Sequence, residues 1–234
     1  MRILAERGMT VAHLTFDQRL EDSPTRLACQ LRGAMGTLFP DQPMFHQHDQ
    51  AGGVLYKYPM IQYRWGQGRG IVVGWEEAAP VLRNLGWLDL LFNLDNKVLQ
   101  VTEVMLCDQK ARFGISDRLL RYALRTPALL FNQRNYRRYK ELSAKERQVE
   151  KDRLLVAQML ISLRGMNVEF PERLYAAFVS PRSIPCTFKG QTLLAVQGQF
   201  VTNAVLPEGF ALGHAVSHGY GWIIPISDTD TEGP

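Results

Sequence analysis

The chain contains little cysteine, no long uninterrupted apolar run and no strong excess of charge of either sign. Its 234 residues include three cysteines, which lie far apart and form no C-x-x-C pair: Cys29, Cys107 and Cys186. This number and spacing argue against a disulfide framework and a thiolate zinc site, and they fit a reducing cytoplasm. The longest apolar run, residues 154–163, contains Gln158 and covers about half a membrane span. The N-terminal sequence MRILAERGMTV lacks the apolar stretch of a signal peptide, so we expect a soluble protein of the cytoplasm.

The composition is that of a folded protein with one basic segment. Hydrophobic residues make up 46% of the chain and charged residues 21%, so the chain can bury a sizeable core in one large domain or two small ones. The 27 Lys and Arg exceed the 23 Asp and Glu by only four. Between Arg112 and Arg153, however, twelve basic residues stand against five acidic ones, so this segment sums to +7 and the rest of the chain to −3. One segment therefore carries the basic character of the chain.

The first hundred residues alternate between strand and helix patterns. In chain order, the predicted elements are a strand at 9–16, a helix at 24–35, a strand at 54–63, a strand at 71–74, a helix at 75–85 and a strand at 97–106. Ser23 is the expected cap of the first helix, and Gly66, Gly68 and Gly70 supply the turn of a hairpin. The order β-α-β-β-α-β is the split βαβ of a ferredoxin-like domain.

From about Ile115 the scheme repeats with a longer helical insert. The predicted elements are a strand at 119–131, a basic stretch, a long helix, and strands near 187–202 and 220–226. The long helix has a capping box at its start, Ser143 and Glu146, and stops at Gly165. We therefore predict an α+β protein of two tandem ferredoxin-like domains, residues 1–112 and 113–226, with a flexible tail at 227–234.

Four of the five histidines fall in two tight clusters, His46 with His48 and His214 with His218. A metal site is disfavoured because zinc needs three or four ligands and no third ligand stands at motif spacing. A phosphoesterase of the His-x-Thr type is excluded because neither cluster places Ser or Thr two residues after each His. General acid/base work on RNA needs only proton transfer near neutral pH and a held phosphate, because the 2′-hydroxyl of the RNA is the nucleophile. No metal or other cofactor would then be required.

The alternative for His46 and His48 is a hydrogen-bonded pair that shapes a loop. The strand that follows favours chemistry, since it carries Tyr56 and Lys57 close behind the two histidines. On a strand, Tyr56 and Tyr58 share a face suited to stacking unpaired bases or to placing a phenol at a phosphate. For Tyr63 we expect ordinary packing in the sheet.

Two further segments could hold a phosphate chain. Residues 209–221 contain four glycines around His214, Ser217 and His218, and closely spaced glycines let backbone N–H groups approach an anion. No Walker lysine is present, which argues against a nucleoside triphosphate site. Residues 132–140 interleave basic side chains with Tyr136 and Tyr139, a pattern that fits either a solvated helix face or contact with a phosphate backbone. The basic side chains of this stretch are Arg134, Arg137, Arg138 and Lys140.

Short motifs in order along the chain resemble the CRISPR-associated endoribonucleases that process precursor CRISPR RNA. In the first half they are LRG at 31–33, LFP at 38–40, FHQH at 45–48 and YKYPMIQY at 56–63. In the second half they are TP at 126–127, FNQRNY at 131–136, ISLRG at 161–165, FKG at 188–190, GQF at 198–200, TN at 202–203, LP at 206–207 and the glycine-rich loop. Each motif is unspecific alone, but the series spans nearly the whole chain.

The resemblance implies two ferredoxin-like domains of the RNA-recognition-motif type, within the RAMP superfamily. It implies metal-independent cleavage of CRISPR repeat RNA to a 5′-hydroxyl and a 2′,3′-cyclic phosphate. The family's catalytic histidine corresponds to His46 or His48, of which we favour His48, and its assisting tyrosine to Tyr56. Lys57, the basic stretch and the glycine-rich loop would bind the RNA, the loop through Gly213, His214, Ser217, His218 and Gly219. Where the family loop carries Lys and Arg, this chain has His214 and His218.

The partner implied is precursor CRISPR RNA. Other proteins of a CRISPR effector complex and a second copy of the chain are open as further partners, and no membrane partner is expected. The competing hypothesis is a non-catalytic RAMP-type subunit that holds CRISPR RNA in such a complex. An α+β protein without an RNA role is a third interpretation, which the basic segment and the ordered motifs disfavour.

Overall fold

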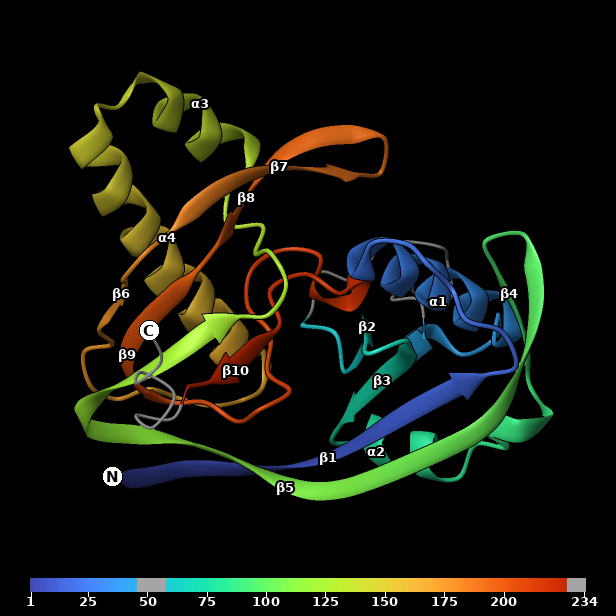
Figure 1. The fold of residues 1–234 in the computed structure, drawn as a ribbon. Coiled ribbons are helices and arrows are strands. Elements are labelled where there is room, and N and C mark those ends of the chain that lie inside the picture. Colours follow the sequence, from blue (N-terminus) through green and yellow to red (C-terminus); the bar gives the residue numbers. More distant parts are fainter. Residues whose placement is uncertain (46–57, 227–234) are drawn as a thin grey trace, which may run out of the picture. The chain divides into compact units, whose positions relative to one another are not determined.

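The computed structural model describes residues 1–45 and 58–226 (Figure 1). The strands are β1 (Arg2–Phe16), β2 (Ile61–Gly66), β3 (Arg69–Trp75), β4 (Leu91–Leu94), β5 (Lys97–Leu124), β6 (Ala176–Phe178), β7 (Arg182–Phe188), β8 (Gln191–Gln197), β9 (Gln199–Val205) and β10 (Ile223–Pro225). The α-helices are α1 (Pro24–Leu38), α2 (Ala78–Arg83), α3 (Gln133–Glu141) and α4 (Ala144–Gly165). Three short 3₁₀ turns are η1 (Pro43–Phe45), η2 (Trp87–Asp89) and η3 (Val216–His218).

The chain forms two compact units whose sequences interleave. The N-terminal unit consists of Arg7–Ala111 and Val216–Gly219. The C-terminal unit consists of Met1–Glu6, Arg112–Ala215 and the chain from Tyr220. Strands β1 and β5 are long enough to run through both units. A stretch of four residues late in the sequence, Val216–Gly219, is thus built into the first unit.

The N-terminal unit has the predicted ferredoxin-like topology. Its elements follow the order β1-α1-β2-β3-α2-β5, and its sheet has the strand order β2-β3-β1-β5. Helix α1 begins as expected, because the Ser23 hydroxyl accepts a hydrogen bond from the Arg26 N–H, and it buries Leu27, Leu31 and Met35 against the sheet. The core between sheet and helices also contains Tyr63, so the expectation of sheet packing for that residue is confirmed.

Several boundaries differ from the predictions. The strand that begins at Lys97 does not stop at residue 106 but continues to Leu124, because its exposed middle still pairs with β1. The strand predicted at 119–131 therefore ends early, and residues 125–132 form a loop. The helix predicted at 75–85 covers only α2, whose first turn lacks a side-chain cap. Strand β2 begins at Ile61, later than predicted.

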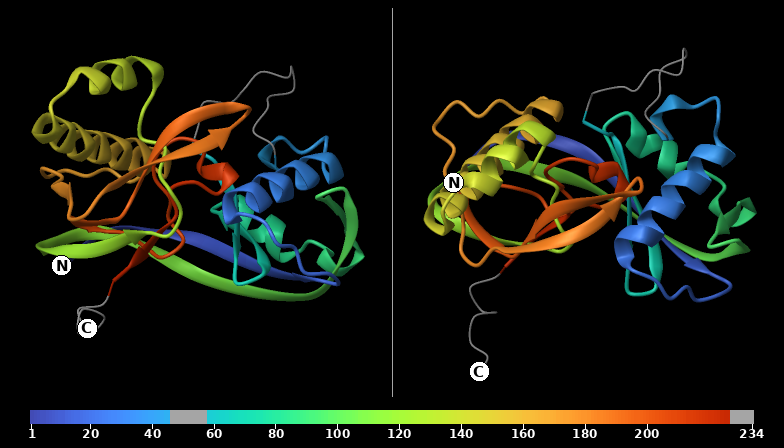
Figure 2. Two further views of the ribbon diagram at one scale, coloured as in Figure 1. Left: turned by 45° about the horizontal axis from the view of Figure 1, so that its top comes forward. Right: turned by 90° about the horizontal axis from the view of Figure 1, so that it is seen from above.

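The C-terminal unit repeats the strand order with a different connection. Antiparallel pairing gives β6-β9-β5-β10, which matches β2-β3-β1-β5 element by element. Helices α3 and α4 follow β5, and α4 packs against β6 (Figures 1 and 2). The β7–β8 hairpin is inserted before β9, and its turn at Lys189 and Gly190 has positive φ at both residues. Between β9 and β10 the described chain has a loop and η3 where the N-terminal unit has α2. These four strands and the long helix make the second half the ferredoxin-like domain that we predicted.

Among residues 1–45 and 58–226, no helix combines the length and the apolar character needed to cross a membrane.

Candidate functional site

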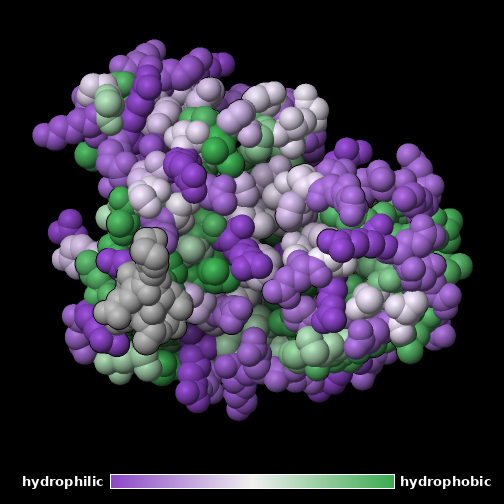
Figure 3. Space-filling view, in the orientation of Figure 1, coloured by the Kyte–Doolittle hydropathy of each residue, from purple (hydrophilic) through white to green (hydrophobic). Residues whose placement is uncertain are grey.

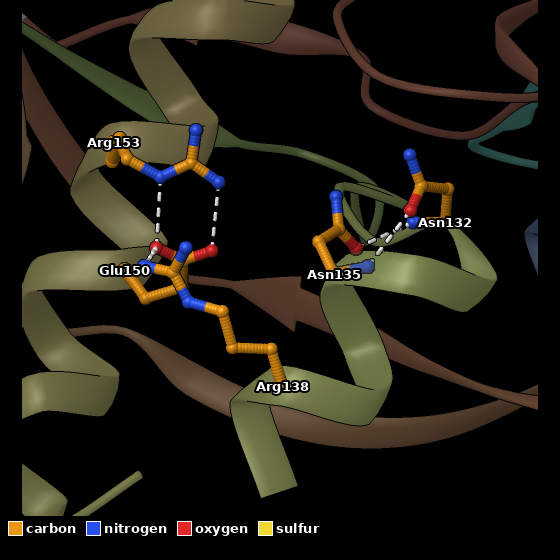
Figure 4. A network of polar contacts seen from close by, with 5 residues as sticks. All are labelled: Asn132, Asn135, Arg138, Glu150 and Arg153. Atoms are coloured by element: carbon orange, nitrogen blue, oxygen red, sulfur yellow. Dashed lines mark hydrogen bonds and ion pairs between the residues drawn. The ribbon is translucent and has the colours of Figure 1, made fainter. Parts of the chain in front are cut away.

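Helix α3 presents the basic stretch to solvent. Asn132 and Asn135 cap it reciprocally, because the Asn135 N–H donates to Asn132 Oδ1 at 2.9 Å and the Asn132 N–H donates to Asn135 Oδ1 at 2.7 Å (Figure 4). Tyr139 is the buried residue of the helix, and its ring lies 4.7 Å from that of Phe131. The four predicted basic side chains are all exposed: Arg134, Arg137, Arg138 and Lys140. In the orientation of Figure 1, strongly hydrophilic residues cover this end of the unit (Figure 3).

Glu150 of α4 joins two arginines into one network. Its carboxylate, 4% exposed, accepts hydrogen bonds from Arg153 at 2.7 and 2.8 Å and from Arg138 at 3.3 Å (Figure 4). The hydrogen bonds from Arg153 and the positive charges of both arginines hold the pKa of the Glu150 carboxyl below its usual value. One negative charge thus serves two guanidinium groups, and the cluster keeps a net positive charge. The sequence alone did not indicate that Glu150 pairs with two arginines. The signal that was available is its position three residues before Arg153, which places both side chains on one face of a helix.

Three other basic residues of α3 differ from Arg138. In the described part of the chain, no carboxylate forms an ion pair with Arg134, Arg137 or Lys140. Lys140 instead lies over the ring of Tyr136, 5.4 Å from its centroid. The helix therefore offers three uncompensated cations and one shared arginine on a rigid, capped scaffold, which suits contact with a phosphate chain.

The glycines of the loop at 209–221 serve close packing of backbone. Gly213, Gly219 and Gly221 all have positive φ, at 98°, 87° and 69°. A Cβ at Gly213 would lie 2.8 Å from the Leu129 carbonyl oxygen, and one at Gly219 would lie 2.6 Å from Ala28 Cβ. These positions exclude side chains because the backbone is left-handed and the neighbours are close.

Three amides of this loop donate hydrogen bonds inside the protein. The His214 N–H donates to Leu129 O at 2.8 Å, the Gly219 N–H to Val216 O at 3.2 Å, and the Gly221 N–H to Pro127 O at 2.9 Å. The N–H groups of His214, Gly219 and Gly221 therefore already have acceptors within the protein, and the predicted contact of this loop with an anion does not run through these three amides.

The structure also divides the second histidine cluster between the two units. His214 belongs to the C-terminal unit, where its Nε2 lies 3.3 Å from Gln158 Nε2, and partial burial lowers the pKa of its imidazole. His218 belongs to the N-terminal unit, where its Nδ1 lies 3.2 Å from the Ser217 hydroxyl and its carbonyl accepts from the Cys29 thiol. The two histidines therefore act in separate environments.

Within the N-terminal unit, residues of strand β2 contact both the region of η3 and the chain on either side of segment 46–57. Phe45 is 1% exposed, and its carbonyl accepts a hydrogen bond from the Tyr63 hydroxyl at 3.0 Å. Pro59 is held in turn, because its carbonyl accepts from Gln62 Nε2 at 3.2 Å. A Cβ at Gly219, directly after η3, would lie 3.2 Å from the Tyr63 carbonyl. The same strand thus anchors both flanks of segment 46–57 and the turn that carries Ser217 and His218.

The predicted catalytic residues His46, His48 and Tyr56, together with Lys57, lie outside the described residues. Within the described ranges, no three His, Cys, Asp or Glu side chains are grouped so that they could hold a metal ion.

Comparison with known proteins places both halves in one family. The model of the Cas6b N-terminal domain matches residues 9–112, and that of the Cas6b C-terminal domain matches residues 114–226. The solved structure titled "Crystal structure of Cas6b" superposes with a TM-score of 0.84 at 22% identity, covering 94% of this chain and 100% of that one. A second, titled as the CRISPR RNA processing endoribonuclease Cas6b, has a TM-score of 0.72 at 21% identity and the same coverage.

A curated relative matches part of the chain. The uncharacterized protein MJ0978 of Methanocaldococcus jannaschii is 24% identical over 136 residues, which are 58% of this chain and 92% of that protein. The structural matches support the fold of two tandem ferredoxin-like domains, and the two domain models together account for nearly the whole sequence. The chain is therefore a member of the Cas6b family.

Proposed function

We propose that the protein is an endoribonuclease that matures precursor CRISPR RNA by cutting within the repeat. The observation that carries the proposal is the match of both Cas6b domain models, over residues 9–112 and 114–226. One structural neighbour is described by its title as a CRISPR RNA processing endoribonuclease. The exposed cations of α3 support RNA as the substrate, since a phosphate chain is the polyanion that such a row of guanidinium groups binds.

In the proposed reaction the 2′-oxygen of the RNA attacks the adjacent phosphorus. The bond between 2′-oxygen and phosphorus forms while the bond to the 5′-oxygen breaks, which leaves a 2′,3′-cyclic phosphate and a 5′-hydroxyl. The proton lost by the 2′-hydroxyl is balanced by the proton gained at the 5′-oxygen. His48, or its neighbour His46, moves one of these protons, and Tyr56 with Lys57 stabilises charge on the phosphate. No redox partner or metal is needed for this balance.

The two units divide the work in this proposal. The N-terminal unit contains the segment with the predicted catalytic residues, and strand β2 and Phe45 fix both of its flanks. The C-terminal unit supplies cations on α3. Of the loop residues in the N-terminal unit, Ser217 is 4% exposed and His218 is half-buried, so in this proposal it is His218 that contacts the RNA from η3.

The test is incubation of the purified protein with the repeat RNA of its own locus in excess EDTA. A matched RNA carries a 2′-deoxy sugar at the cut site. One cut in the first RNA and none in the second would support metal-independent attack by the 2′-hydroxyl. Tight binding without a cut would favour the competing hypothesis of a non-catalytic subunit, and an absence of binding would refute both.

A further inference from the structure

A groove runs along the outer side of α4 in the C-terminal unit. It measures about 660 Å³, a volume within the range of pockets that hold small ligands. One wall is a single face of α4 that includes Val156 and Leu160, and the other is the segment from Phe170 to Ala176 that leads into β6. Apolar side chains thus contribute to both walls.

An exposed tyrosine stands at the lip of this groove on a fixed backbone. Tyr175 is 52% exposed, and its backbone N–H donates to Asn203 Oδ1 at 2.8 Å. Asn203 also donates through Nδ2 to the Arg173 carbonyl at 3.0 Å, and its own N–H donates to the Tyr175 carbonyl. A single, nearly buried side chain therefore clamps residues 173–175. An aromatic ring left open to solvent on a fixed backbone is the usual platform for an unpaired base.

The charges around the groove favour an anionic ligand. The Arg173 guanidinium lies over the Tyr175 ring, 5.1 Å from its centroid, and Arg164 lines the same groove. No carboxylate of residues 1–45 or 58–226 forms an ion pair with either arginine.

Both acids of the groove are engaged elsewhere. Asp152 Oδ1 accepts from the Phe178 N–H at 2.9 Å and from Gln148 Nε2 at 3.2 Å. Glu172 Oε1 accepts from Arg2 Nη2 at 2.5 Å. Asp152 keeps its negative charge, because both of its donors are neutral, but the three arginines that line the groove, Arg153, Arg164 and Arg173, outnumber it.

The groove is also linked to the basic helix through one carboxylate. Arg153 lines the groove, and it shares the Glu150 carboxylate with Arg138 of α3. Figure 4 shows this shared carboxylate. We propose that the α4 groove binds an unpaired segment of the RNA, with a base stacked on Tyr175 and phosphates held by Arg164 and Arg173. This proposal rests on the proposed function and adds to it a second site for single-stranded RNA.

The experiment measures the affinity of the full chain for labelled repeat RNA and for labelled oligouridine by fluorescence anisotropy. Tyr175→Ala removes the platform and is expected to weaken binding about 5- to 100-fold, whereas Tyr175→Phe keeps the ring and should bind like the wild type. Arg164→Ala and Arg173→Ala should each weaken binding and lower the salt slope by about one. Arg118→Ala, which removes the same charge from an exposed position on β5, is the matched control.

A second readout locates the contact directly. RNA containing 5-iodouridine should crosslink under light to the peptide that contains Tyr175, and mass spectrometry identifies that peptide. If the wild type binds and cuts RNA but the Tyr175, Arg164 and Arg173 variants bind as well as Arg118→Ala, the groove proposal is overturned while the proposed function stands. A groove that serves a protein partner would give that result. If the wild type binds neither RNA, both proposals fall.

Discussion

The two units share one strand order but differ in the connection between their last two strands. In the N-terminal unit the connection from β3 to β5 contains a helix, α2, whereas in the C-terminal unit the connection from β9 to β10 is a glycine-rich loop with the short turn η3. The loop does not simply replace a helix, because its residues Val216–Gly219 pack into the N-terminal unit against α1 and β2. The comparison shows how two copies of one fold come to differ. The N-terminal copy keeps its helix, whereas four residues of the equivalent connection in the C-terminal copy belong to the N-terminal unit.

The asymmetry extends to the polar chemistry. The C-terminal unit carries the exposed cations, on α3 and along the α4 groove. The N-terminal unit carries the flanks of the histidine segment and the pair of Ser217 and His218. If the N-terminal unit performs catalysis and the C-terminal unit binds the RNA, substitutions in the N-terminal unit should reduce the cleavage rate. Substitutions in the C-terminal unit should reduce the affinity for RNA.

The largest effect should come from His48→Ala. Loss of a group that transfers a proton in the rate-determining step costs about 10²- to 10⁴-fold in rate. We expect single-turnover cleavage of repeat RNA to fall by that factor while the dissociation constant stays within about threefold of the wild type, a change of less than ~1 kcal/mol. His46→Ala is the matched variant, and near-normal cleavage by His48→Ala with loss in His46→Ala would move the role to His46.

The next effect concerns the loop that distinguishes the two units. Gly221→Ala forces a Cβ onto the Leu212 carbonyl oxygen at a φ of 69°, whereas Gly190→Ala has a similar φ of 73° with nothing within 4 Å. Gly190→Ala should cost about 1 kcal/mol of unfolding free energy for the left-handed backbone alone. Gly221→Ala adds the close approach and should cost about 3 kcal/mol, measured by urea denaturation. Equal losses in the two variants would show that the loop relaxes and that its shape is not fixed by packing.

The topology was predictable from the sequence, but the interleaving of the units was not. Alternation and turn glycines predicted the β-α-β-β-α-β order, and Ser143 with Glu146 located the start of α4, where both side chains form the expected capping box. The extent of β5 was hidden because its middle residues are exposed on both faces and carry no alternating pattern. The packing of Val216–Gly219 depends on contacts with Ala28 and Tyr63, nearly two hundred residues away in one case, and local patterns do not record such contacts.

The site was predictable only as residue types. Four basic side chains on α3 were identified, and the structure leaves them exposed. The difference between Arg138 and the other three was not visible in the sequence, because only the fold brings Glu150 to Arg138. The glycines of the loop predicted N–H groups open to an anion, but three of these N–H groups, those of His214, Gly219 and Gly221, donate to carbonyls of residues 129, 216 and 127. Tyr175 lies in no motif, and the side chain that holds its backbone, Asn203, comes 28 residues later in the sequence.

A smaller effect separates the arginines of α3. Arg137→Ala removes an uncompensated cation, so we expect affinity for repeat RNA to fall several-fold and the salt slope to fall by about one. Arg138→Ala removes a cation that already shares Glu150, so its effect should be about half as large on a logarithmic scale. Anisotropy titrations over a range of salt concentrations measure both. Equal effects would mean that RNA binding breaks the Arg138 ion pair, and rates at saturating RNA should stay unchanged in both variants.

The smallest effect, and the one that links stability to binding, is that of Glu150→Gln. The folded state lowers the pKa of this carboxyl, so the stability it provides is complete above its ordinary pKa of about 4.3 and is lost as pH falls toward the lowered value. The wild type should therefore lose more unfolding free energy than Glu150→Gln between about pH 5 and pH 3, by roughly 1 kcal/mol, because both arginine partners remain solvated. Glu169→Gln, at an exposed position after α4, controls for the charge change.

At pH 7 the same variant should bind RNA more tightly than the wild type, since two guanidinium groups lose the carboxylate that they share. A variant that is less stable yet binds RNA more tightly would show that Glu150 stabilises the fold but lowers the net positive charge that the basic surface presents to RNA. Weaker binding by Glu150→Gln would instead show that the carboxylate is needed to orient Arg138 and Arg153 toward the phosphates, and that geometry outweighs charge on this face of the C-terminal unit.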